Sequence, residues 1–237
     1  MKGKMVKGKI ISRILDKQAL IIYLAVCLML FILAPGQKSV MNVLGGFSPQ
    51  GSKGLDIIGI MRWNLCVLPP VAVSILFMDV EMGALRVYTL IRTKNAKRWF
   101  LPRFIAIAVA NLSYLFLFTV LAEVYTGSGD YNRGSFYVFL TIFFLHSFMM
   151  SVISAALCAW SGGVHVSVIF FLAVEGIMVV IGDIFPRTAA YLLPYWGMIQ
   201  QVGVTHDGSV LYLVLIIGVS VAMIIGAALL IIKCLRA

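Results

Sequence analysis

One ionisable side chain lies inside a long apolar run of this sequence. Glu175 stands in the stretch AVEGIMVV, within the apolar residues 164–181. A charge at the centre of a bilayer costs roughly 2.5–3.5 kcal/mol on insertion scales, so a carboxyl there is protonated, paired or next to water. Two interpretations stay open. Glu175 lies on a translocation path and responds to protons, or it is a neutral carboxyl that hydrogen-bonds a neighbouring helix, near Gly176.

Serine and histidine also occur in the apolar runs, which raises the question of a membrane hydrolase. Ser161, followed by two glycines and then His165, could supply a nucleophile, and His146 could act as its base. The sequence has no Gly-x-Ser-x-Gly turn, and isolated Ser and His in apolar helices more often hydrogen-bond between helices. The three histidines, His146, His165 and His206, are dispersed and form no HExxH motif. We therefore expect neither a catalytic residue nor a metal site.

The sequence shows no glycine loop of the kind that holds nucleotide phosphates. Gly3-Lys4 and Gly8-Lys9 lack both the GxxxxGK[ST] spacing and the hydroxyl residue that follows it. We expect no cofactor in this chain and no enzymatic activity of its own. Any ATP and magnesium would be bound by a separate chain.

One long charged segment, residues 78–103, separates two apolar runs. It carries two acidic and six basic residues, namely Asp79, Glu81, Arg86, Arg92, Lys94, Lys97, Arg98 and Arg103. Between these charges lies the apolar run 87–91. Basic residues in a loop set the orientation of a membrane protein, but acidic residues contribute little to that bias. Orientation alone therefore explains neither Glu81 nor the apolar run.

Composition defines the class of protein that must position these residues. The chain of 237 residues is 62% hydrophobic and 12% charged, with a mean hydropathy of +1.03, whereas a soluble domain is about half apolar and a quarter charged. We predict an all-α integral membrane protein with a single transmembrane domain, 1–237. The net charge of +10 is placed at the ends of the apolar runs, which fits membrane orientation and not nucleic-acid binding.

The apolar runs predict six transmembrane helices. They cover roughly residues 19–33, 63–78, 104–124, 136–160, 164–181 and 209–232. The first is short for the ~20 residues that a span needs. Pro69-Pro70 should kink or break the second, and the carbonyls that they leave without donors place this face against protein or water.

Three segments outside the spans have predicted structure. Residues 1–18 are basic, with Ile10, Ile11, Ile14 and Leu15 at helical spacing, which favours an interfacial helix over a solvated basic tail. Residues 161–163, Ser-Gly-Gly, predict a tight turn. Residues 182–208 are apolar and aromatic, with Tyr191, Tyr195 and Trp196, which favours short helices that dip into the outer leaflet or cap the domain, with an ordered interfacial loop as the alternative.

The distribution of basic residues predicts the orientation. Six lie in the N-terminal segment, six in residues 79–103 and two in the C-terminal tail; the opposite side carries only Lys38, Lys53, Arg62, Arg133 and Arg187. The positive-inside rule then places both termini and residues 79–103 in the cytoplasm, with the chain in the plasma membrane.

The charged segment resembles a pattern found in permeases of the type-2 ABC exporter family. That pattern has an acidic residue and a glycine after the second span, an apolar helix, a basic turn and a basic residue at the start of the third span. The matching residues are Glu81-Met82-Gly83, 87–91, Arg92-Thr93-Lys94, Lys97-Arg98-Trp99 and Arg103. The order of elements and the YLLP at 191–194 are also similar, whereas Arg92 replaces the usual proline before the basic turn.

This resemblance implies that residues 79–103 form a cytoplasmic coupling helix that docks in a groove of an ATPase. The residues assigned to coupling are Glu81, Gly83, Leu85, Arg86, Tyr88, Arg92, Lys97 and Arg98. The implied partners are two copies of an ATP-binding subunit, a second permease copy or paralogue, and membrane lipids. The implied substrate is amphipathic or membrane-soluble, such as a peptide antibiotic, a drug or a lipid-like molecule, which suggests antibiotic resistance or bacteriocin immunity.

A second interpretation does without an ATPase. The chain would then be a secondary transporter, or a non-catalytic partner subunit, with Glu175 as its proton-sensitive residue. No internal repeat is visible in the sequence, which weakens the inverted-repeat transporter folds.

Overall fold

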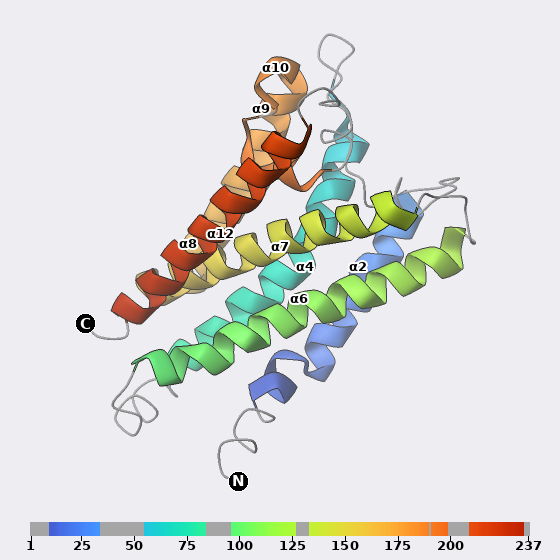
Figure 1. The fold of residues 1–237 in the computed structure, drawn as a ribbon. Coiled ribbons are helices and arrows are strands. Elements are labelled where there is room, and N and C mark those ends of the chain that lie inside the picture. Colours follow the sequence, from blue (N-terminus) through green and yellow to red (C-terminus); the bar gives the residue numbers. More distant parts are fainter. Residues whose placement is uncertain are drawn as a thin grey trace.

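The computed structural model describes residues 10–33, 55–83, 96–126, 133–189, 191–198 and 209–234. In these ranges all regular structure is helical, which confirms the all-α prediction (Figure 1). The long helices are α2 (Lys17–Leu33), α4 (Ile57–Met82), α6 (Ala96–Thr126), α7 (Arg133–Ser161) and α12 (Ser209–Cys234). A further rod is built from α8 (Val164–Phe171), the π-helical segment η2 (Leu172–Ile177) and α9 (Met178–Ile184).

Five helices in the described ranges are long and apolar enough to cross a membrane. They are α4, most of α6, most of α7, the rod α8–η2–α9, and most of α12. The predicted first span corresponds to α2, which has 17 residues and so covers about 26 Å, somewhat less than the ~30 Å of hydrocarbon. A multi-pass membrane architecture is thus supported by five spans, and a sixth would need α2 to cross with the help of flanking residues.

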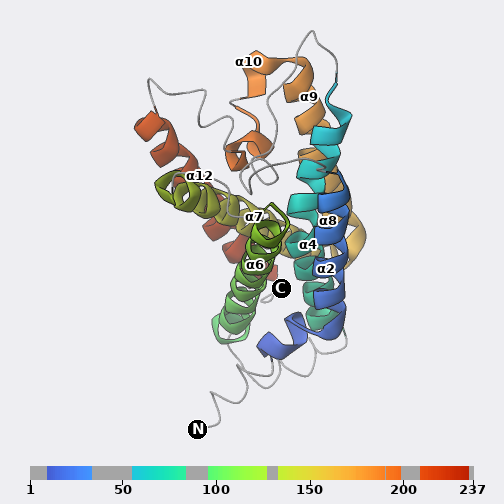
Figure 2. The same cartoon turned by 90° about the vertical axis from the view of Figure 1, so that its right-hand side faces the viewer.

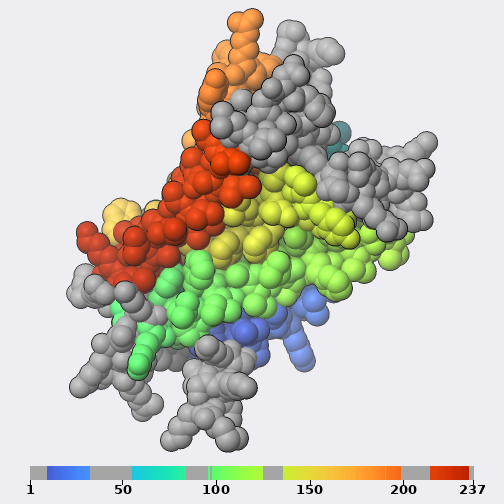
Figure 3. Space-filling view, in the orientation of Figure 1, coloured from blue at the N-terminus to red at the C-terminus, as the bar shows by residue number. Residues whose placement is uncertain are grey.

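Helix α7 is the central element of the fold. It contacts α4, α12, α8 and α6, and Figure 2 shows it crossing between α6 and α12 on one side and α4 on the other. Small residues on its second half, including Ser154, Ala155 and Ala156, are fully or almost fully buried, because small side chains allow membrane helices to approach closely. In contrast, α12 leaves many of its described apolar side chains exposed, Leu215, Ile225 and Leu229 among them, and Figure 3 shows the helix at the surface of the molecule.

The double proline does not break α4. The helix runs unbroken through Pro69 and Pro70, so the break, which was one of the two outcomes predicted for them, does not occur. Both prolines are buried, which confirms that this face lies against protein. Ser74 donates from its hydroxyl to the carbonyl of Pro70 at 2.7 Å, and packing of α4 against α2 and α7 holds the helix together on both sides.

Residues 10–14 form a short helical turn before α2. Ile10 and Ile14 are buried in the core, and Ile11 and Leu15 pack against it, which is the apolar face that the sequence predicts. Asp16 then begins the next helix, because its Oδ1 accepts a hydrogen bond from the Ala19 amide at 2.9 Å. A helical N-terminal segment is therefore confirmed for these residues, and it packs on the bundle.

The tight turn predicted at residues 161–163 and short helices within residues 182–208 are also present. Gly162 has a φ of 74°, a left-handed conformation that suits glycine. Beyond α9 the chain forms α10 (Pro186–Ala189) and the 3₁₀ helix η3 (Leu193–Gly197), with α10 at the top of Figure 1. Tyr195 is completely buried, and so η3 caps the bundle as expected.

Candidate functional sites

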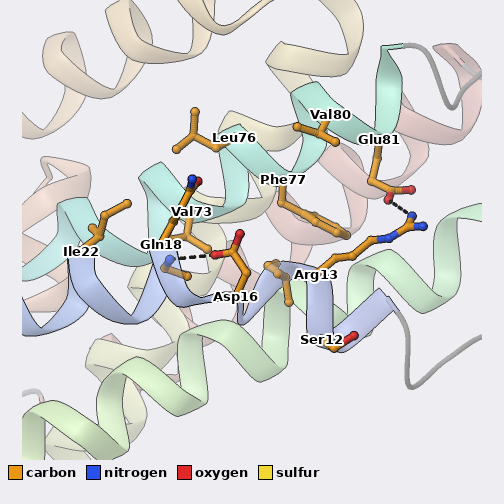
Figure 4. A pocket seen from close by; sticks show the side chains of 12 residues that line it. Ser12, Arg13, Asp16, Gln18, Ile22, Val73, Leu76, Phe77, Val80 and Glu81 are labelled. Carbon is orange, nitrogen blue, oxygen red and sulfur yellow. Dashed lines mark hydrogen bonds and ion pairs between the residues drawn. The ribbon is translucent and has the colours of Figure 1, made fainter.

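The first candidate site, the Glu81 cluster, joins three segments at one end of the bundle. Glu81, in the last turn of α4, is 1% exposed. Its Oε2 accepts hydrogen bonds from Nε and Nη2 of Arg103 in α6 at 2.8 and 2.6 Å. Its Oε1 accepts from Nη1 of Arg13, in the N-terminal turn, at 3.1 Å (Figure 4). One carboxylate thus ties the end of α4 to the start of α6 and to the N-terminal segment.

Arg103 is held by more than its carboxylate partner. Its Nη1 donates to the carbonyl of Trp99 at 2.7 Å, and its guanidinium carbon lies 3.9 Å from the centre of the Trp99 ring. A planar guanidinium can donate in one plane and stack on an aromatic face at the same time, which an ammonium group cannot do. The arginine is therefore fixed in orientation as well as in charge.

The Glu81 cluster carries an excess of one positive charge, because two guanidinium groups share one carboxylate. The side chain of Arg103 is 8% exposed, whereas that of Arg13 is 54% exposed. The buried Arg103–Glu81 pair is therefore structural. The excess charge reaches the surface at Arg13.

Of the residues that the sequence assigns to ATPase coupling, four lie outside the described ranges: Leu85, Arg86, Tyr88 and Arg92. Gly83 ends α4, and its amide donates to the carbonyl of Asp79 at 2.9 Å. Lys97 and Arg98 lie in the first turn of α6. The segment assigned to coupling is thus anchored by the two helix ends that the Glu81 cluster joins.

Sequence reasoning singled out Glu81 but missed both of its partners. Arg103 was noted as a basic residue at the start of a span, and Arg13 as one of many N-terminal charges. One sequence feature could have pointed to these partners. Glu81 is one of only two acidic residues in a charged segment between two predicted helices, and such a carboxylate, if buried, needs a counter-charge nearby.

The second candidate site, the Glu175 cluster, lies where α4, α7 and η2 meet. Glu175 is completely buried. Its Oε2 accepts a hydrogen bond from Nε1 of Trp63 in α4 at 2.9 Å, and its Oε1 lies 2.8 Å from Nε2 of His146 in α7. Glu175 thus contacts two neighbouring helices, through Trp63 and His146, which agrees with the hydrogen-bonding part of the second interpretation.

Local backbone geometry positions this carboxyl. Glu175 lies in the π-helical segment η2, where one extra residue per turn rotates the side chains that follow relative to those before. Above the cluster, Gly197 packs directly on the His146 ring, since a Cβ built there would lie 2.7 Å from Cγ. The 3₁₀ helix η3 thus closes the cluster on that side.

The 3₁₀ helix η3 is itself held to α9 by a buried tyrosine. Burial, and secondarily the nearby Asp183 carboxylate, raises the pKa of the Tyr195 phenol well above its ordinary value. The hydroxyl stays protonated and donates to the carbonyl of Val179 at 2.7 Å. Gly182 makes room for the Tyr195 ring, because any Cβ there would overlap it.

The Glu175–His146 contact contains at least one shared proton. If Glu175 is ionised, Nε2 of His146 carries a hydrogen and donates to it. If Glu175 is neutral, its hydroxyl donates to Nε2 and the hydrogen of the imidazole moves to Nδ1. Within the described residues, Nδ1 of His146 is buried and has no hydrogen-bond partner. In either arrangement the contact ties η2 to α7.

The structure separates the residues of the hydrolase hypothesis. Ser161 lies fifteen residues after His146 on the same helix, a distance of about 22 Å along the axis, and its hydroxyl donates to the carbonyls of Leu157 and Gly163. His165 is exposed on α8. No group of three metal-ligating side chains occurs within the described ranges.

The fold and these two clusters define a helical, multi-pass membrane protein with buried ionisable pairs between its helices. Searches of protein-family models, curated proteins and solved structures found no match for this chain.

Proposed function

We propose that this chain is the membrane-spanning permease subunit of an ATP-driven exporter. The observation that carries the proposal is the Glu81 cluster. The segment assigned to ATPase coupling connects the end of α4 to the start of α6, and the Arg103–Glu81 pair joins those two helices. Arg13 extends the connection to the N-terminal segment. A displacement of the coupling segment would then move three elements together.

In this proposal Glu81 acts within the chain. Both of its oxygens are engaged and it is 1% exposed, so it transmits movement through its ion pairs and does not touch the ATPase. In this proposal the residues that contact the ATPase directly are Leu85, Arg86, Tyr88 and Arg92. Lys97 and Arg98 lie at the edge of that contact. This division of roles refines the one implied by the family resemblance.

The other parts of the proposal follow from the same resemblance. Two ATP-binding subunits supply ATP and magnesium, and both termini are cytoplasmic. A second permease copy or paralogue packs against this one in the plasma membrane. The extensive exposed apolar faces of α12 and of the rod α8–η2–α9 support lateral contacts with a permease or with lipid. The substrate is amphipathic or membrane-soluble, such as a peptide antibiotic, a drug or a lipid-like molecule.

The test is purification of the full-length, tagged chain from its native membrane. An ATP-binding subunit should co-purify, and the complex should hydrolyse ATP. Arg86→Glu together with Arg92→Glu should release that subunit or reduce hydrolysis at least tenfold, because both changes place a repulsive charge in the docking segment. Arg187→Glu is the matched control. Arg187 is exposed in α10, on the side of the membrane predicted to lie opposite the docking segment. Full ATP turnover and recovery in the double variant would refute the coupling role.

A second function is favoured by one specific observation, the buried Glu175–His146 contact at 2.8 Å. Such a pair can bind and release a proton in the membrane, as a secondary transporter requires. Transport that persists when ATP hydrolysis is blocked, and stops in Glu175→Gln, would establish this alternative. Transport that stops with ATP hydrolysis would exclude it.

A further inference from the structure

A pocket of about 460 Å³ lies between the N-terminal segment and α4, beside the Glu81 cluster (Figure 4). Its volume is within the range of about 300–1,000 Å³ that is usual for small-molecule sites. It is lined by Ser12, Arg13, Ile14, Asp16, Gln18, Ala19, Ile22, Val73, Leu76, Phe77, Val80 and Glu81. Arg13 and Glu81 belong to the Glu81 cluster, whereas the other lining residues belong to neither cluster described above.

The pocket is amphipathic along its length. One wall is apolar and comes from α4, and two of its side chains, Leu76 and Val80, are 49% and 62% exposed. On a transmembrane helix such exposure means that the wall continues into lipid. The opposite wall is polar and comes from the turn and helix start at residues 12–18. The pocket therefore suits a molecule with a charged head and an aliphatic tail.

Two opposite charges lie at the head end. Arg13 carries the excess positive charge of the Glu81 cluster, and its side chain is 54% exposed. Asp16 is exposed; its Oδ1 caps α2, and a carboxylate has further lone-pair sites for another donor. Figure 4 shows the Asp16 side chain between those of Arg13 and Gln18, directed toward the α4 wall. A head that carries both an anion and a cation would complement both charges.

We propose that this pocket binds a zwitterionic phospholipid with a primary amine, of the phosphatidylethanolamine type. The phosphate contacts Arg13, the ammonium donates hydrogen bonds to Asp16, and one acyl chain lies along Leu76 and Val80. A purely anionic lipid has no cation for Asp16, and a choline head has no N–H to donate to it. This inference stands on the pocket alone and does not depend on the exporter proposal.

The test measures lipid binding to the full-length protein in detergent by native mass spectrometry. Dioleoyl lipids with ethanolamine, glycerol or choline heads are titrated separately, so that only the head differs. The ethanolamine lipid should bind about tenfold more tightly than either of the others, as expected for one charge-assisted hydrogen bond. Equal binding of the glycerol lipid would overturn the proposal, and so would displacement of the ethanolamine lipid by an equal concentration of soluble phosphoethanolamine.

The deciding variant is Asp16→Asn. Asparagine caps a helix as well as aspartate does, so α2 should be kept while the charge is lost. The preference for the ethanolamine lipid should fall to within about twofold of the glycerol lipid. Asp16→Ser, another good capping residue, repeats the test independently of any effect of asparagine on the helix. Lys17→Gln is the matched control, because Lys17 is the neighbouring charge but does not line the pocket. A preference that survives both Asp16 variants would overturn the proposal.

Discussion

The guanidinium of Arg103 donates two hydrogen bonds to one oxygen of Glu81, from Nη2 at 2.6 Å and from Nε at 2.8 Å. The two side chains are 8% and 1% exposed, so the pair lies almost entirely out of solvent. Within the chain itself, the end of α4 is therefore fixed to the start of α6. A buried pair of this kind is best understood through the cost of removing one member, which leaves the other charge without a partner.

Glu81→Leu should lower the free energy of unfolding by about 3–5 kcal/mol, because Arg103 would remain buried without its counter-charge. Unfolding in mixed detergent and SDS micelles measures this change. The double variant Glu81→Leu/Arg103→Leu should recover a large part of the loss. Arg13→Gln is the control: it removes only the half-exposed ion pair and should cost less than about 1 kcal/mol. Equal losses in Glu81→Leu and Arg13→Gln would contradict the dominant role of Arg103.

The helices could be predicted from the sequence because apolar runs and flanking charges are local signals. The tight turn at Gly162 and the apolar face of Ile10 and Ile14 were predicted for the same reason. Long-range pairing could not be, since Glu81 is 68 residues from Arg13 and Glu175 is 112 residues from Trp63.

Other features were missed because they depend on packing. Helix α4 continues through Pro69-Pro70, where local rules allowed a break, and it packs against α2 and α7 on the way. The π-helical segment at Glu175 has no sequence signal in the apolar run around it. Local periodicity was therefore enough to predict the helices, whereas the partners of Glu81 and Glu175 could be identified only from the three-dimensional structure.

Gly162→Ala should destabilise the turn between α7 and α8 by about 1 kcal/mol. Gly162 has a φ of 74°, and an L-residue with a Cβ pays a steric penalty in that region. Gly163→Ala is the matched control, because Gly163 has a φ of −165°, which any residue adopts, and a Cβ there meets no atom within 4 Å. Unfolding in SDS micelles compares the two variants, and an equal effect would contradict the role assigned to Gly162.

Gly182→Ala should loosen η3 from the bundle. A Cβ at this position would overlap the Tyr195 ring, and overpacking of this kind costs about 1–3 kcal/mol. Limited proteolysis of the segment that contains α10 and η3 should become faster. Gly218→Ala in α12 is the control, since a Cβ there meets nothing within 4 Å and alanine favours the helix. Unchanged proteolysis in Gly182→Ala would show that Tyr195 does not anchor the segment.

Two substitutions of Glu175 separate its contribution to stability from its charge. In Glu175→Gln the amide can accept from Trp63 through its oxygen and donate to Nε2 of His146 through its nitrogen, so stability should stay within about 1 kcal/mol of the original chain. In Glu175→Leu both partners lose their hydrogen bonds while buried, and the loss should be about 2–5 kcal/mol. Unfolding in SDS micelles measures both changes. Equal losses would mean that the charge, and not the hydrogen bonds, stabilises the cluster. If Gln keeps the fold, the effect of Glu175→Gln on transport reports on the proton alone, which is what distinguishes a proton-coupled transporter from an ATP-driven one.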